Sequence, residues 1–164
     1  MRKGEQEHYF REWLEQHKGT LVKVTRSFAN SPADFDDLYQ EILLQVWKSI
    51  PRFKNESSSV TWVYRVSLNR AIAWKKKEDK QRNLIRILAE TPFEATPAND
   101  KAQRIEEIYV AIRSLDKADR ALILMSLDGL SYEAISKIAE ISTSNVGVRL
   151  NRIRKKLSEH LKWD

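Results

Sequence analysis

Apolar residues recur at helical spacing along most of the chain. These stripes predict helices at about residues 9–28, from 31 or 34 to 49, 60–77, 104–114 and 117–127. No segment shows a clear alternation of apolar and polar positions, which is the pattern of a half-buried strand. The predicted fold class is therefore all-α.

Residues 131–157 predict two further helices joined by a tight turn. Ser131 and Ser142 are suitable N-caps for them. The apolar positions of the second helix share one face: Val146, Leu150, Ile153 and Leu157. Cationic residues gather on the rest of that helix, and a helix that is apolar behind and basic in front is typical of one that enters the major groove of DNA. The alternative is a basic helix that only packs on its own domain, but the preceding helix, at helix-turn-helix spacing, favours DNA binding.

Residues 90–103 interrupt the helical pattern. Pro92 and Pro97 each disfavour a helical conformation in the residue before them. We predict a flexible linker here, which joins two small helical domains at 1–89 and 104–164. The alternative, a long loop within one domain, is uncommon in compact domains.

The composition favours a polyanionic partner. The 164 residues include 29 Lys and Arg against 23 Asp and Glu, a formal net charge of +6, and no cysteine. The absence of cysteine excludes disulfides and thiolate metal sites. No apolar run approaches the roughly 20 residues that span a bilayer, and no secretory signal is visible. We therefore expect a cytoplasmic protein without a membrane span of its own.

Catalytic chemistry finds little support in the chain. The three histidines are scattered, none lies at a metal-binding spacing from a carboxylate, and there is no Gly-rich phosphate loop. We expect no enzymatic activity, no catalytic residue, no metal site and no cofactor.

The charges fall in separate blocks, which indicates at least two kinds of contact. Residues 34–41 are acidic, whereas 61–82 and 141–164 are basic. Within 57–77, the aromatic residues Trp62, Tyr64 and Trp74 alternate with cations. Aromatic rings can stack on unpaired bases while cations follow the phosphates. For Tyr64 and Trp74 a place in a helical core is an equal alternative, and for Trp62 it is the favoured one.

Four segments in this order resemble a bacterial RNA polymerase sigma factor of the extracytoplasmic-function type, the compact class with only sigma regions 2 and 4. They are DDLYQEILLQVWKSIPRF, TWVYRVSLNRAI, LDKADRALILMSLDGLSYEAISKIAEIS and NVGVRLNRIRKKL. The resemblance covers about Tyr9 to Leu157. It implies a protein that binds core RNA polymerase and promoter DNA, and that an anti-sigma protein restrains.

The resemblance also assigns three sets of residues. The set expected to bind core polymerase is Asp37, Leu38, Gln40, Glu41 and Trp47. The set expected to capture the melted −10 strand is Ser57, Ser58, Thr61, Tyr64, Arg65, Asn69, Arg70 and Lys75. The set expected to read the −35 duplex is Ser142, Thr143, Ser144, Asn145, Arg149, Arg152, Arg154 and Lys155.

Two other functions are compatible with parts of this pattern. One is a helix-turn-helix regulator that is not a polymerase subunit, and the other is a sigma-like interaction module without DNA contact. The acidic block followed by Trp47 favours polymerase docking over the first, and the cations of 149–156 disfavour the second. The chain departs from the family at Glu140, where the turn often has Gly, and at Gly147, which costs a helix interior about 1 kcal/mol relative to Ala.

Overall fold

The computed structural model describes residues 1–84 and 99–162, and every regular element in these ranges is helical. The chain divides into an N-terminal unit, Met1–Pro92, and a C-terminal unit, Phe93–Asp164. The all-α prediction is confirmed. Most of the predicted linker, and the apolar residues Ile85, Ile87 and Leu88 before it, lie outside the described residues, so the predicted domain boundaries stay predictions.

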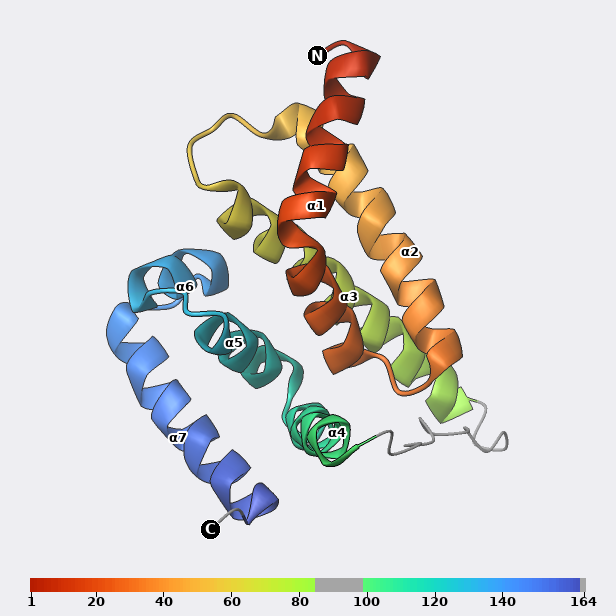
Figure 1. Cartoon of the computed structure of the whole chain (residues 1–164). Coiled ribbons are helices and arrows are strands. Elements are labelled where there is room, and N and C mark those ends of the chain that lie inside the picture. Colours follow the sequence, from red (N-terminus) through yellow and green to blue (C-terminus); the bar gives the residue numbers. More distant parts are fainter. Residues whose placement is uncertain (85–98, 163–164) are drawn as a thin grey trace. The chain divides into compact units, whose positions relative to one another are not determined.

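The N-terminal unit is a bundle of three long helices. They are α1 (Lys3–Phe28), α2 (Pro32–Ser49) and α3 (Ser59–Leu84), with the short 3₁₀ helix η1 (Ile50–Arg52) after α2. Figure 1 shows α1, α2 and α3 side by side, and each packs on the other two. Because α3 contacts both neighbours, it buries a wide stripe rather than a narrow one. The buried residues of that stripe are Val63, Tyr64, Ser67, Leu68, Ala71, Trp74 and Lys75.

Local chemistry sets the ends of these helices. Ser31 accepts a hydrogen bond from the backbone N–H of Asp34 at 3.1 Å, and Pro32 occupies the first helical position of α2. The polar segment after η1 has Asn55 at a positive φ of 58°, which reverses the chain toward α3. At the base of this segment the Phe53 ring lies against Trp13 and Trp62, with centroids 5.0 and 5.5 Å away.

The C-terminal unit has four helices in its described residues. They are α4 (Asp100–Arg113), α5 (Lys117–Leu127), α6 (Tyr132–Ala139) and α7 (Thr143–Leu161), and α7 contacts each of the other three (Figure 1). Its core includes Ile112, Leu122, Met125, Ile135, Val146, Leu150 and Ile153.

Side-chain caps begin all four of these helices. The caps predicted at Ser131 and Ser142 are confirmed, while Asp116 caps α5 and Asn99 caps α4. Gly129 lies two residues beyond the end of α5 at a φ of 81°. Glu140 adopts a left-handed conformation, φ 57° and ψ 40°, in the turn before α7, so the turn forms here without glycine.

No helix in the described ranges is both long enough and apolar enough to cross a bilayer.

Candidate nucleic-acid and protein interfaces

The outward face of α2 carries acidic, amide and apolar groups together. Asp37 and Gln40 are exposed, and Leu44, which lies one turn after Gln40, is 52% exposed. Two carboxylates of this helix are bound to α3. Asp37 Oδ2 accepts a hydrogen bond from Trp74 Nε1 at 3.0 Å, and half-buried Glu41 pairs with Arg70. The acidic face is therefore fastened to the helix beside it.

Two residues predicted for polymerase docking have other roles in the bundle. Leu38 is fully buried, so in this structure it is a core position of the bundle. Half-buried Trp47 packs edge-on against Phe10, with ring centroids 5.3 Å apart, and its carbonyl accepts a hydrogen bond from Gln6 Nε2 at 2.8 Å. Sequence reasoning missed Leu44, although its spacing of seven from Asp37 places it on the same helical face.

A groove of about 340 Å³ runs along the outer side of α3, where α2 and η1 flank it. It is lined by Gln45, Ser49, Arg52, Trp62, Arg65, Val66, Asn69, Arg70 and Ala73. Three guanidinium groups, one indole and two side-chain amides thus share a single concave surface. Ser49 Oγ accepts a hydrogen bond from Trp62 Nε1 at 3.0 Å, which fixes the indole on the groove wall. This combination suits a single nucleic-acid strand, since rings stack on bases and cations neutralise phosphates.

The structure brings together part of the predicted −10 set. Arg65, Asn69 and Arg70 line the groove, while Ser58 and Thr61 lie at the start of α3, where the Thr61 N–H donates to Ser58 Oγ at 3.3 Å. Ser57 is half-buried in the segment before them. Trp62 lines the same groove, although the predicted −10 set does not include it. Its spacing of three and seven from Arg65 and Asn69 is the signal that places it on their face.

Two members of the −10 set are buried in this structure. Tyr64 is 0% exposed within the bundle, so its ring cannot stack on a base in this structure. Lys75 is 6% exposed, and its ammonium lies 3.5 Å from Asp79 Oδ1. Both residues belong to the buried stripe of α3 and not to its outer side.

The first turn of α7 presents polar side chains to solvent. Ser142, Thr143, Ser144 and Asn145 are all exposed. Ser142 Oγ accepts the N–H of Asn145 at 3.1 Å, which caps the helix and leaves the hydroxyl able to donate. Farther along, Arg152 and Lys155 are exposed on the outward side. Backbone N–H groups, hydroxyls and cations arranged in this way match the requirements of a duplex reader.

Two arginines of the predicted −35 set are turned toward their own unit. Arg149 Nη2 donates to Oδ1 of the buried Asp119 at 2.6 Å, and Arg149 is only 23% exposed. Arg154 donates to Ser126 Oγ at 2.9 Å and to the Tyr132 hydroxyl at 3.5 Å. In this structure Arg149 is the partner of a buried carboxylate, and its part in reading the −35 duplex stays a prediction. Arg154 remains exposed but is bound to α5 and α6.

Gly147 also faces inward. A Cβ at this position would lie 3.4 Å from Cε2 of Tyr132 on α6. The glycine therefore faces the preceding helix of the helix-turn-helix, not the outward side that DNA would contact.

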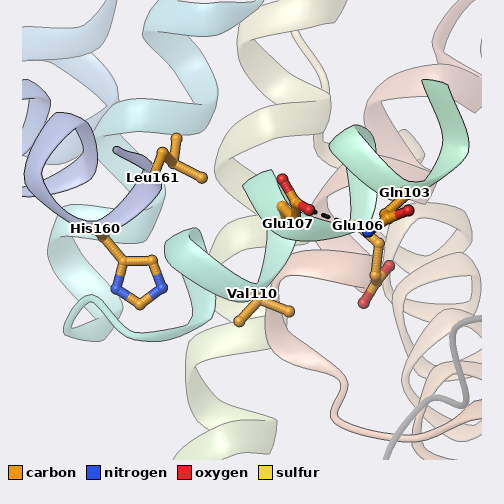
Figure 2. A pocket seen from close by; sticks show the side chains of 6 residues that line it. All are labelled: Gln103, Glu106, Glu107, Val110, His160 and Leu161. Atoms are coloured by element: carbon orange, nitrogen blue, oxygen red, sulfur yellow. Dashed lines mark hydrogen bonds between the residues drawn. The ribbon is translucent and has the colours of Figure 1, made fainter. Parts of the chain in front are cut away.

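A second hollow of about 340 Å³ lies between α4 and the C-terminal turn of α7 (Figure 2). Its lining is Gln103, Glu106, Glu107, Val110, His160 and Leu161. Glu106 pairs with Arg113 at 2.6 Å, and Glu107 accepts a bond from Gln103 at 3.5 Å. Two carboxylates on its wall disfavour a phosphate backbone. Among the described residues, no cluster of His, Asp and Glu is arranged to hold a metal ion.

Known families match both units in the order in which they occur. The family described as Sigma-70 region 2 matches residues 13–81, and Sigma-70, region 4, matches residues 105–157. Among curated proteins, the chain is 28% identical over 141 residues to an ECF RNA polymerase sigma-E factor of Haemophilus influenzae, covering 78% of this chain and 75% of that protein. It is 27% identical over 137 residues to the ECF RNA polymerase sigma factor SigX of Bacillus subtilis, covering 77% and 70%.

Two solved structures share the fold. The sigma factor RpoE in complex with the anti-sigma factor NepR from Bartonella quintana superposes with a TM-score of 0.75 at 21% identity, covering 94% of this chain and 98% of that one. CnrH in complex with the cytosolic domain of CnrY superposes with a TM-score of 0.64 at 24% identity, covering 95% and 89%.

Proposed function

The chain belongs to the sigma-70 family, in its extracytoplasmic-function class, and from this premise we propose that three of its surfaces divide the work of promoter recognition. It is a sigma factor, a transcription initiation factor that binds core RNA polymerase and directs it to promoter DNA. The family itself is not enzymatic.

The outward face of α2 is proposed to dock on core polymerase. Exposed Asp37 and Gln40 supply a carboxylate and an amide, and exposed Leu44, one turn after Gln40, supplies an apolar group beside them. An apolar anchor with polar groups around it is the usual composition of a protein interface. Leu38 takes part only by supporting the helix from inside.

The groove along α3 is proposed to hold the melted −10 strand, and this groove is the observation that carries the division of labour. Trp62, Arg65 and Asn69 offer stacking, phosphate neutralisation and base-edge hydrogen bonds on one concave surface. The segment 54–58 beside it is exposed for the most part, and Phe53 anchors its base. This arrangement suits capture of an unstacked base.

The outward side of α7 is proposed to read the −35 duplex. Ser142, Thr143, Ser144 and Asn145 lie at its N-terminal turn, and Arg152 and Lys155 follow on the same exposed side. Arg149 contributes by holding α7 on α5. We further propose that the protein works in the cytoplasm, where polymerase and promoters are, and that an anti-sigma protein covers these surfaces, as the structural neighbours in such complexes suggest.

The proposal is tested by transcription in vitro with purified core polymerase over a randomised promoter library. Promoter-dependent initiation from a shared −35 and −10 sequence is expected.

Leu44→Glu should weaken polymerase binding, whereas the conservative Leu44→Met should not. Arg65→Ala should reduce initiation on duplex templates, and initiation by this variant should recover on a template that is already melted at −10. Absence of initiation from every sequence would refute the proposed function.

A further inference from the structure

One exposed residue of α7 does not fit the polar and cationic character of its surroundings. Val148 is 68% exposed, which makes it the most exposed large apolar side chain in the described part of the chain. It follows the buried Val146 by two positions, about 200° around the helix, so it lies opposite the buried stripe. Val148 therefore occupies the centre of the outward face.

The residues around Val148 form a surface for a polyanion. Ser144 lies one turn before it and Arg152 one turn after it, and both are exposed. Over its whole length α7 has five cationic residues and one acidic residue, Glu159. The charge disfavours a purely apolar partner and complements nucleic acid. With Arg149 held by Asp119, the middle of this surface is the isopropyl group of Val148.

An apolar side chain in the middle of a face that reads duplex DNA requires an apolar group on the DNA as its contact. In the major groove this group is the C5-methyl of thymine, the one alkyl group that a base edge presents there. A β-branched residue suits this contact because its side chain is stiff and loses little freedom when it is bound.

We propose that Val148 contacts the C5-methyl of a thymine in the −35 element and thereby selects for thymine at one position. The inference rests on the proposed function of α7 as the −35 reader and adds the identity of one base that it recognises. Val148 acts there as a specificity residue, whereas Arg152 and Lys155 hold the backbone irrespective of sequence.

The test uses templates that differ by single methyl groups. A promoter selected from the library is rebuilt with each thymine of its −35 element, on either strand, replaced by deoxyuridine, which lacks only the C5-methyl. With the unaltered protein and core polymerase, initiation should fall about fourfold at one of these positions, the effect of burying roughly one methyl group. With Val148→Ala, the thymine and deoxyuridine templates should become equal at that position.

Two control variants separate this contact from a general loss of function. Arg152→Ala should lower initiation on both templates by the same factor, so their ratio should persist. Val110→Ala removes another exposed apolar side chain, on α4, and should also preserve the ratio. Because Val148 is exposed, the unfolding of Val148→Ala should match that of the parent protein.

The outcomes distinguish the inference from the function on which it rests. If initiation is promoter-dependent but no deoxyuridine has an effect, or the selected −35 element contains no thymine, the assignment of Val148 is wrong. The same holds if Val148→Ala keeps the thymine preference. If no template supports initiation, the proposed function itself fails.

Discussion

Arg149 and Asp119 form an ion pair between α7 and α5, with Nη2 of the arginine 2.6 Å from Oδ1 of the aspartate. Asp119 is buried in the first turn of α5. Its backbone N–H donates a hydrogen bond to the side chain of the N-cap residue Asp116 at 2.8 Å. A carboxylate removed from water requires such a partner. The pair therefore attaches α7, the proposed −35 reader, to the body of its unit.

Replacing Arg149 with alanine should destabilise the C-terminal unit. The change leaves the Asp119 carboxylate buried without its cation, and removal of one partner from such a pair costs about 3–5 kcal/mol. The measurement is chemical unfolding of the full chain followed by circular dichroism. The matched control is Arg152→Ala, an exposed cation on the same helix, for which a change within about 0.5 kcal/mol is expected.

A double substitution sharpens this test. Asp119→Leu combined with Arg149→Met removes both charges, and it should recover most of the stability that Arg149→Ala loses. If Arg149→Ala unfolds like the parent and loses only promoter selectivity, the arginine is a DNA contact after all.

Substitution of Gly147 with alanine should stabilise α7. Alanine is favoured over glycine inside a helix by about 1 kcal/mol, and the new Cβ would lie in ordinary contact with Tyr132 at 3.4 Å. A gain of that size corresponds to a rise of about 4–8 °C in the melting temperature of a unit this small. Binding to −35 duplex should be unchanged, because this position faces α6. A lower melting temperature would show that the helices cannot accept the methyl group.

Substitution of Glu140 with glycine should also stabilise the C-terminal unit. Glu140 has a φ of 57°, and the left-handed conformation costs a non-glycine residue roughly 1–2 kcal/mol. The expected net gain in the free energy of unfolding is about 1 kcal/mol, since glycine also loses more freedom on folding. Glu140→Ala is the matched control: it removes the same carboxylate but retains the strained backbone, so it should bring no such gain. Equal stability of the two variants would contradict the backbone explanation.

His17 should make the stability of the N-terminal unit depend on pH. This side chain of α1 is 9% exposed, its Nε2 lies 3.0 Å from Ser59 Oγ, and burial lowers its pKa from the ordinary value of 6.5. The unfolded chain therefore takes up the proton at a higher pH than the folded chain. The free energy of unfolding is unaffected well above pH 6.5 and decreases as pH falls below it.

The measurement is the free energy of unfolding of the parent and of each variant between pH 5 and 8. It is obtained from urea unfolding followed by tryptophan fluorescence. His17→Gln should lose less stability on acidification than the parent, because it has no group that titrates there. His8→Gln, which changes an exposed histidine of the same helix, should retain the parental dependence. Parallel curves for the parent and His17→Gln would exclude His17 as the source.

Much of the fold could be predicted from local sequence signals. The helix stripes and the caps Asp116, Ser131 and Ser142 depend on neighbouring residues, so the sequence alone contains their cause. The inward direction of Arg149 does not follow in this way, because Asp119 lies 30 positions earlier on another helix. The periodicity of α3 likewise indicates a buried stripe but not its width. That width depends on the packing of two neighbouring helices, and it decides the burial of Tyr64 and Lys75.

The bonds that join α2 to α3 also limit how this protein can diverge. Asp37 and Glu41 lie on the proposed docking helix, yet Trp74 and Arg70 of α3 hold their carboxylates. A substitution at either acid changes the bundle and the docking surface at once, so selection acts on both properties together. Exposed Gln40 and Leu44 are the positions at which a lineage could adapt to an altered polymerase surface and still keep its fold.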